Sequence, residues 1–306
     1  MMKAIGIDIG GTKTNIGIVD EKGKVLEKKT FATNAQNPSK LKDDLINEIY
    51  NIIKKDNDMQ GIGIASAGRV DFSSNKVVYA TDNLKGWTNI PITEILKKEF
   101  KLPVYIDNDV NAALLCDIVL NPNLAEQTVI FLTIGTGLGG AIAINGNIIR
   151  GKTGSSGEFG HMVLYPGGHK CNCGKEGCAE QYISGTAYKK ILKKKLIKNG
   201  LEVVTETSPT TIQEKIFKSN PIYMEALKEI SSNLAILLES IKNCIDYDTC
   251  IIGGSFTVYQ ELILKFIEER FSDYNHKYSK DPEFIFSRQG NSAGMIGGGL
   301  QVFESL

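Results

Sequence analysis

The sequence has no excess charge of either sign and no long apolar run. It contains 35 basic and 35 acidic residues among 306, so its formal net charge is zero. Broad binding to nucleic acid or to a membrane surface needs a basic excess, and we expect neither partner. No segment approaches the roughly 20 apolar residues that span a bilayer. The first apolar stretch is short and is broken by Asp8 and glycines, unlike a signal peptide. We therefore expect a soluble, cytoplasmic protein.

Cysteine is also scarce, with six residues in the whole chain. That number is too small for a disulfide scaffold. Three of the six lie close together, at positions 171, 173 and 178. Without a secretion signal, such a cluster indicates metal ligands rather than disulfides. The apolar fraction of 42% is high enough to exclude disorder for the bulk of the chain.

Glycine, in contrast, is frequent, and its 31 residues gather in clusters. A strand, a glycine turn, a strand, a short turn and a third strand are predicted twice along the chain. The strands are expected at 3–9, 15–20 and 24–30, and again at 128–134, 141–144 and 148–150. We interpret this order as an internal repeat. Two related α/β halves with glycine turns imply a nucleotide cleft between them.

Helical spacing of apolar residues predicts the remaining elements around this repeat. The first helix should begin at Asn37-Pro38, with proline at the first helical position. Further helices are expected at 91–100, from 109, at 187–198, 223–246 and 259–271, and after 293, with strands at 61–65, 76–80, 104–106, 250–252 and 284–286.

Three glycine turns are candidate phosphate or nucleotide sites, because glycine lets backbone amides approach an anion closely. The first carries Asp8, Gly10, Gly11, Thr12 and Lys13, the second Thr133, Gly135, Thr136 and Gly137, and the third Gly253 and Gly254. At the end of a strand, Asp8 could hold a magnesium ion through water. Taken singly, the first turn would favour an ordinary hairpin and the third an ordinary strand-to-helix connection. Three such turns in two repeated halves favour a nucleoside triphosphate site.

The second turn also matches the G-x-G-x-x-G pattern of dinucleotide-binding proteins. That pattern requires a helix directly after the turn. Here the residues AIAINGN follow, which predict a strand and a hairpin. We therefore reject the dehydrogenase interpretation.

The run Asp107-Asn108-Asp109 follows a predicted strand and opens a predicted helix. A carboxylate at that point can accept the proton of a substrate hydroxyl that attacks a phosphoryl group. Asn108 can orient a sugar hydroxyl as both donor and acceptor. The competing explanation is a helix N-cap, which aspartate and asparagine commonly form.

Cys171, Cys173 and Cys178 with one histidine would complete a tetrahedral Cys₃His zinc site. Both His161 and His169 are candidates for the fourth ligand. Four strong ligands leave no open position, so this zinc would be structural. Glu158 and Glu180 flank the cluster, and each is either a ligand for a sugar hydroxyl or a surface carboxylate.

Taken together, the segments DIGGTKTNIG, DNDVNAA, LTIGTGLGGAI, GSSGEFGHM and CNCGKEGCAE resemble the ROK family of sugar kinases and sugar-responsive repressors. The resemblance runs from residue 4 to about 300. It implies a two-domain actin-like ATPase fold, of the ribonuclease H-like, hexokinase type, with duplicated βββαβ-type halves. The implied domains are 1–117 with the C-terminal helix 294–306, and 118–293 with the zinc site.

The resemblance also implies roles for individual residues. Asp109 would be the catalytic base, and Asn108, Glu158, His161 and Glu180 would contact the sugar. His161, Cys171, Cys173 and Cys178 would hold zinc, the first two glycine turns would cradle the phosphates of Mg-ATP, and Gly253 and Gly254 would lie near the adenosine.

The sugar itself stays open. Gly68, Arg69 and the following valine, with Thr81 beyond them, resemble the N-acetylmannosamine kinase domain of the bifunctional sialic-acid enzyme. Glucose and N-acetylmannosamine are both expected candidates, and phosphoryl transfer to the sugar 6-hydroxyl is the expected reaction. Family members are commonly homodimers. The alternative function is a non-catalytic sugar-binding regulator, although no room for a DNA-binding helix-turn-helix is seen before Asp8.

Overall fold

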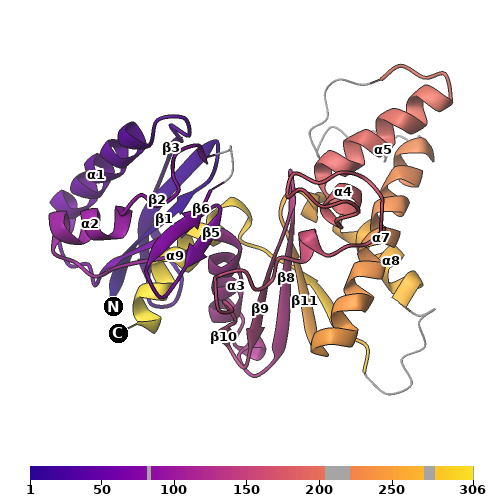
Figure 1. Ribbon diagram of the computed structural model, residues 1–306. Helices are drawn as coiled ribbons and strands as arrows, with labels where there is room; N and C mark the ends of the chain where they lie inside the picture. Colours follow the sequence, from indigo (N-terminus) through magenta and orange to yellow (C-terminus); the bar gives the residue numbers. More distant parts are fainter. Residues whose placement is uncertain (81–83, 204–220, 272–279, 306) are drawn as a thin grey trace. The chain divides into compact units, whose positions relative to one another are not determined.

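The computed structural model describes residues 1–80, 84–203, 221–271 and 280–305. Contacts between Cα atoms divide the chain into two compact units (Figure 1). The first unit consists of Met1–Glu126, Ala141–Ser156 and Gln289–Leu306, and the second of Gln127–Gly140 and Gly157–Arg288. The domain boundary expected at residue 117 stays a prediction.

The first unit is built on a five-stranded sheet with the order β3-β2-β1-β4-β7. Its first three strands form an antiparallel meander. β4 then pairs with β1 in parallel, and β7 pairs with β4 in parallel. Two further strands, β5 and β6, pair separately. The bounds are β1 (Lys3–Ile9), β2 (Lys13–Asp20), β3 (Val25–Ala32), β4 (Ile62–Ser66), β5 (Arg69–Asp71), β6 (Lys76–Tyr79) and β7 (Val104–Asn108).

One face of this sheet is lined by isoleucines that alternate along the strands and pack under helices α1 (Pro38–Lys55) and α2 (Ile92–Phe100). The Asn37 side chain caps α1 by accepting a hydrogen bond from the Lys40 amide. Pro38 occupies the first turn, where its missing N–H costs nothing. The predicted start of this helix is therefore confirmed.

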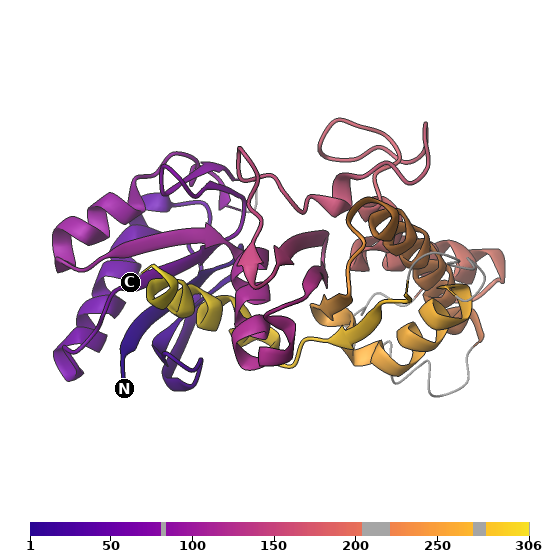
Figure 2. The same cartoon turned by 90° about the horizontal axis from the view of Figure 1, so that it is seen from below.

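The opposite face carries a row of three glycines, because Gly6 pairs with Gly17 on one side and Gly63 on the other. Helix α9 (Ala293–Glu304) lies on this row (Figure 2). A Cβ atom on Gly63 would overlap the carbonyl oxygen of Gly298. The glycines thus allow a helix to lie directly on the backbone of the sheet. Helix α3 (Asp109–Leu120) packs beside α9.

The second sheet has the order β10-β9-β8-β11-β12, which repeats the order of the first. Here too the last two strands are parallel to their neighbours, so the predicted duplication is confirmed. β9 begins in the second unit and ends in the first. The bounds are β8 (Thr128–Ile134), β9 (Leu138–Ile144), β10 (Asn147–Ile148), β11 (Thr249–Gly253) and β12 (Glu283–Phe286).

Four α-helices pack together in the described part of the second unit, and the longest of them, α7, packs against α4, α5 and α8. Buried residues recur along α7 at helical spacing and form the core of this unit. Among the residues that the structure describes, the α-helices of this unit are α4 (Glu180–Ile183), α5 (Gly185–Lys198), α7 (Pro221–Ile245) and α8 (Gln260–Phe271). The 3₁₀ turns in the described parts of the chain are η2 (Pro122–Leu124), η3 (Phe159–His161), η4 (Ser255–Tyr259) and η6 (Gly290–Ser292).

The structure differs from the sequence prediction in a few short segments. β5 was not predicted, and the strand after the second glycine turn begins at Leu138, so Gly139 and Gly140 belong to the strand. α4 was not predicted. Among the described residues, no helix combines the length and apolarity needed to cross a membrane.

Candidate active site

Asp109 is the first residue of α3 and follows β7 directly. Asn108 caps this helix, because its Oδ1 accepts hydrogen bonds from the amides of Val110 and Asn111 at 2.9 and 3.3 Å. Its Nδ2 donates to the carbonyl oxygen of Gly68 at 2.9 Å. The N-cap explanation for Asn108 therefore holds, and its contact with a sugar stays a prediction. The cap fixes Asp109 at the positive end of the helix.

Asp109 is half-buried, and its Oδ1 accepts a hydrogen bond from the Val110 amide at 3.0 Å. Burial raises the pKa of Asp109 to about 7, the negative charge of Asp8 adds to the increase, and the Val110 amide opposes it. A carboxylate with such a pKa can take up a proton near neutral pH. This property is what a general base requires.

Asp8 lies near the end of β1 and is also half-buried. Burial raises the pKa of Asp8 to about 6, while the hydrogen bond from Asn15 Nδ2 at 3.2 Å and the charge of Lys28 lower it. Asn15 is itself held in place, because its Oδ1 accepts from the Thr30 hydroxyl at 2.8 Å. The first unit thus brings together two carboxylates, and the negative charge of Asp8 makes ionisation of Asp109 more costly.

The first glycine turn joins β1 to β2, and the Gly10 amide donates to the Lys13 carbonyl at 3.1 Å. Gly10 and Gly11 are half-buried, whereas the side chains of Thr12 and Lys13 are exposed. The turn therefore leaves one hydroxyl and one ammonium group accessible to an anion.

Gly68 lies next to Asn108 in the first unit, and Arg69 follows it as the first residue of β5. Gly68 has a φ of 100°, and a Cβ atom there would overlap the carbonyl oxygen of Tyr79, so only glycine fits. Arg69 is exposed on β5, and its guanidinium donates to the Ser155 hydroxyl at 3.4 Å. Thr81, the third residue of this predicted sugar contact, lies outside the described residues.

The second glycine turn belongs to the second unit, where Gly135 donates its amide to the Gly137 carbonyl at 3.0 Å. Glu180 Oε2 accepts from the Leu138 amide at 3.1 Å and lies against Gly137. Thr136 is exposed at the tip of the turn, and Thr133 lies within β8. Glu180, which was predicted to contact the sugar, therefore also contacts the second glycine turn, which was predicted to bind phosphate.

The third glycine turn connects β11 to η4. Gly254 has a φ of 85°, and a Cβ atom there would lie 2.5 Å from the carbonyl oxygen of Ile134. A Cβ atom on Gly253 would lie 2.7 Å from the ring of Phe131. Packing against β8, which carries Phe131 and Ile134, already explains both glycines. Their place near adenosine stays a prediction.

His161, Cys171, Cys173 and Cys178 form one cluster, with ligand atoms within 4.8 Å of one another. His161 Nδ1 lies 3.7 Å from Cys171 Sγ, and the sulfurs of Cys173 and Cys178 are 3.6 Å apart. A tetrahedral site with Zn–S bonds of about 2.3 Å has edges of roughly 3.8 Å. The four residues therefore fit a structural zinc ion.

His169, the competing ligand, is not part of this cluster. Its ring stacks on Tyr182 with the centroids 5.0 Å apart. Nδ1 of His161 faces the sulfurs, and Nε2 lies 4.0 Å from Glu158 Oε2. The orientation leaves Nε2 available for a second partner, next to a carboxylate that was predicted to bind the sugar.

Sequence reasoning missed the partners that hold the predicted residues in place. Asp107 was one of two candidate carboxylates in the run 107–109, and its 2.7 Å ion pair with Arg150 was not predicted. Asn15 and Ser155 were not singled out at all. Arg150 is one of four arginines in a lysine-rich chain, which was the only available signal.

Comparisons with known proteins agree with these features. The protein-family model described as ROK family matches residues 4–302 of this chain. A glucokinase of Halalkalibacterium halodurans is 29% identical over 312 residues, covering 97% of this chain and 94% of the relative. A xylose repressor of Caldicellulosiruptor bescii is 31% identical over 277 residues, covering 87% of this chain and 69% of the relative. The solved structure of a ROK family glucokinase from Streptomyces griseus, in complex with glucose and AMPPNP, is 28% identical, covers 99% of both chains and has a TM-score of 0.82.

Proposed function

The chain belongs to the ROK family and has its actin-like, hexokinase-type fold, and from this premise we propose that it is an ATP-dependent sugar kinase. The glucokinases similar to it over nearly their whole length support a kinase that acts on a hexose. The observation that carries the proposal is Asp109, a half-buried carboxylate at a helix start whose pKa is raised to about 7.

In the proposed reaction, the Asp109 carboxylate takes the proton of the sugar 6-hydroxyl. The hydroxyl oxygen forms a bond to the γ-phosphorus of ATP as the bond from that phosphorus to the bridging oxygen breaks. ADP leaves with the bonding electron pair, and Asp109 then releases its proton to solvent. The raised pKa suits both proton steps, because a base works best when its pKa is near the working pH.

The first two glycine turns supply donors for the phosphates. Their amides, with the hydroxyls of Thr12 and Thr136, orient the phosphate chain and offset the negative charge that spreads during transfer. Magnesium bound with the nucleotide would neutralise phosphate charge, and Asp8 would hold it through water.

The Cys₃His cluster is proposed to bind one structural zinc ion. Burial and the neighbouring thiols raise the pKa of Cys178 to about 12, so a cation beside its sulfur is needed to hold Cys178 as a thiolate. A zinc ion would fix the ring of His161 through Nδ1. Nε2 of that ring would then be a fixed donor for a sugar hydroxyl.

Two sugars compete as the substrate. Glucose is supported by the relatives named glucokinase, and the Gly68-Arg69 pair is the basis for N-acetylmannosamine. Arg69 is exposed, and its guanidinium donates a hydrogen bond of 3.4 Å to the Ser155 hydroxyl. Such a side chain is suited to contact a substituent of the sugar ring, and one contact of this kind changes selectivity modestly.

The test is magnesium-dependent release of ADP from ATP in the presence of glucose, mannose, fructose, N-acetylglucosamine or N-acetylmannosamine. One of these sugars should give a strong response. Asp109→Asn should lower turnover about 10²–10⁴-fold with little change in sugar affinity. Asp58→Asn, the same change at a side chain that is 71% exposed, is the matched control and should keep full activity.

Two outcomes would contradict the kinase. If Asp109→Asn remained as active as the control, the assigned base would be wrong. If folded protein bound a sugar by calorimetry but released no ADP with any of the five, the sugar-binding regulator would replace the kinase, a role consistent with the similar xylose repressor.

A further inference from the structure

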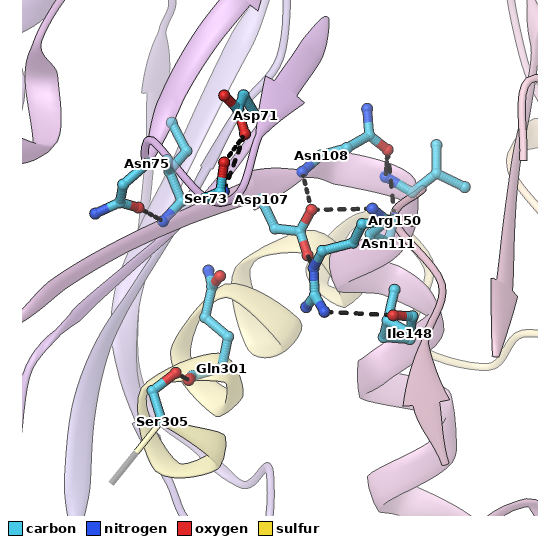
Figure 3. A network of polar contacts seen from close by, with 12 residues as sticks. Asp71, Ser73, Asn75, Asp107, Asn108, Asn111, Ile148, Arg150, Gln301 and Ser305 are labelled. Atoms are coloured by element: carbon cyan, nitrogen blue, oxygen red, sulfur yellow. Dashed lines mark hydrogen bonds and ion pairs between the residues drawn. The ribbon is translucent and has the colours of Figure 1, made fainter. Parts of the chain in front are cut away.

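Asp107 is a buried carboxylate that the proposed reaction does not use. It lies two residues before Asp109 at the end of β7, and its exposed fraction is 4%. Oδ1 accepts hydrogen bonds from the Asn108 amide at 2.7 Å and from Asn111 Nδ2 at 2.9 Å (Figure 3). The carboxylate therefore holds the backbone amide of Asn108 just before Asp109 and the side chain of Asn111 just after it, in the first turn of α3.

Arg150 neutralises this carboxylate from a distant part of the sequence. Its Nε donates to Asp107 Oδ2 at 2.7 Å, and one of its terminal nitrogens donates to the Ile148 carbonyl at 3.4 Å (Figure 3). The guanidinium also lies over the ring of Phe72, 3.9 Å from its centroid. Contacts on several sides fix the orientation of the guanidinium, and with it that of the Asp107 carboxylate.

The segment that carries Arg150 also reaches the predicted sugar contact. In the same loop, Ser155 accepts a hydrogen bond from Arg69, and Gly154 packs so closely on the Val70 carbonyl that a Cβ atom would overlap it. One loop thus touches both the start of α3 and β5. A fold that needed only a stable helix start would not require this connection, because Asn108 already caps α3.

We propose that Arg150 and Asp107 are positioning residues for phosphoryl transfer, and that their ion pair holds the Asn108–Asp109 backbone in the orientation in which Asp109 reaches the sugar hydroxyl. This inference rests on the proposed kinase function. Asp107 acts through the Asn108 amide and Asn111, and Arg150 acts through Asp107. Neither residue needs to touch the sugar or the nucleotide.

The first experiment compares steady-state kinetics of Arg150→Gln, Arg150→Lys, Asp107→Asn and the double variant Arg150→Gln/Asp107→Asn. We expect Arg150→Gln to lower kcat about 10–100-fold while KM for sugar and ATP changes less than about threefold, because misplacement of a base acts on the chemical step. Arg150→Lys should recover part of the loss. The double variant should be no slower than the worse single variant, since both changes break the same pair. Arg288→Gln, at an exposed arginine, is the matched control.

Two kinetic results would overturn the proposal. An unchanged kcat in Arg150→Gln would show that the pair does not position the base. A raised KM with unchanged kcat would assign Arg150 to binding instead.

The second experiment measures amide hydrogen exchange by mass spectrometry and does not depend on turnover. In Arg150→Gln, exchange should accelerate in peptides that span residues 104–112, while peptides from β1, β2 and α9 keep the protection of the wild-type protein. Faster exchange throughout the first unit would make the pair a general fold contact and would overturn the proposal. If the wild-type protein phosphorylated none of the five sugars, the kinase proposal would fail, and the exchange pattern alone would still decide whether Arg150 holds this segment.

Discussion

Asp109 carries a cost in folding stability that follows from its chemistry. Its pKa is raised to about 7 by burial and by the charge of Asp8, whereas an unfolded aspartate has a pKa of about 3.9. Below pH 4 the side chain is protonated in both states and contributes no difference. Between pH 4 and 7 the unfolded chain ionises first, so the protein loses stability as the pH rises, and above pH 7 the loss is constant.

This argument predicts that Asp109→Asn unfolds at a higher temperature than the wild-type protein at pH 8, and by less at pH 5. Each pKa unit corresponds to about 1.4 kcal/mol, and after a discount for partial exposure we expect a gain of about 1–3 kcal/mol at pH 8. The measurement is thermal unfolding of both proteins across this pH range. Asp58→Asn, at a largely exposed side chain, should show no comparable gain. A gain independent of pH would mean that ionisation of Asp109 is not its cause.

At the residue scale, the sequence predicted which types of side chain form the site better than it predicted the role of each one. Asp107 and Asp109 are identical in type and two positions apart, and only the resemblance to the family selected Asp109. The structure separates them physically, because Asp107 is paired with Arg150 and Asp109 has no cation among its described contacts. A pairing across 43 positions leaves no local pattern in the sequence.

At the scale of single elements, the contact of α9 with the glycine row of the first sheet sets the strictest limit on side-chain size. Gly6, Gly17 and Gly63 lie side by side across three strands, and the backbone of α9 rests on Gly6 and Gly63. The sequence predicted a glycine-rich helix after residue 293 but gave no reason for its composition. The reason is a contact between distant segments, in which an added Cβ atom at Gly6 or Gly63 would overlap the backbone of the helix.

We therefore predict that Gly63→Ala destabilises the first unit by about 2–4 kcal/mol, because overpacking forces backbone shifts. Gly135→Ala is the matched control, since no atom lies within 4 Å of its added Cβ, and it should change unfolding by less than about 0.5 kcal/mol. Thermal unfolding measures both, and hydrogen exchange assigns the loss to β1, β4 and α9. Equal effects of the two changes would show that the close helix contact is not required.

The zinc loop is a second element whose stability depends on a few residues. Cys178→Ser removes a buried member of the cluster, whereas Cys244→Ser changes an exposed cysteine outside it. We expect one equivalent of zinc by elemental analysis in the wild-type protein and in Cys244→Ser, and a strong loss in Cys178→Ser. Full zinc occupancy in Cys178→Ser would rule out the proposed ligand set.

Elements with a long periodic pattern were predicted well, and short ones were not. The helix over 38–55 has apolar residues at helical spacing and an asparagine-proline start, and both signals act locally. β5 has three residues and α4 has four, which is too few for a period to appear. The fold of β5 depends on packing with the 150–156 loop, and that of α4 on packing with α5 and α7.

At the scale of the whole molecule, the first unit joins segments from both ends of the chain. Its sheet is complete by residue 108, yet α9, which covers the glycine face, begins at residue 293. Contacts over such separations require loop closure before they contribute stability. The N-terminal sheet should therefore stay only partly protected until the last helix is present.

This leads to a prediction for a chain that ends at Arg288 and so lacks α9. Its glycine face would be exposed to water, and we expect residues 1–126 to be cut rapidly in limited proteolysis, while fragments that contain α7 and α8 persist, because that helical core lies in the second unit. Mass spectrometry of the fragments gives the measurement. A chain that ends at Glu304 keeps all of α9 and should match the full-length protein. If residues 1–126 were equally protected in both truncated chains, the sheet with α1 and α2 would be stable without α9. The contact of α9 with the glycine face would then not be needed to hold the first unit folded.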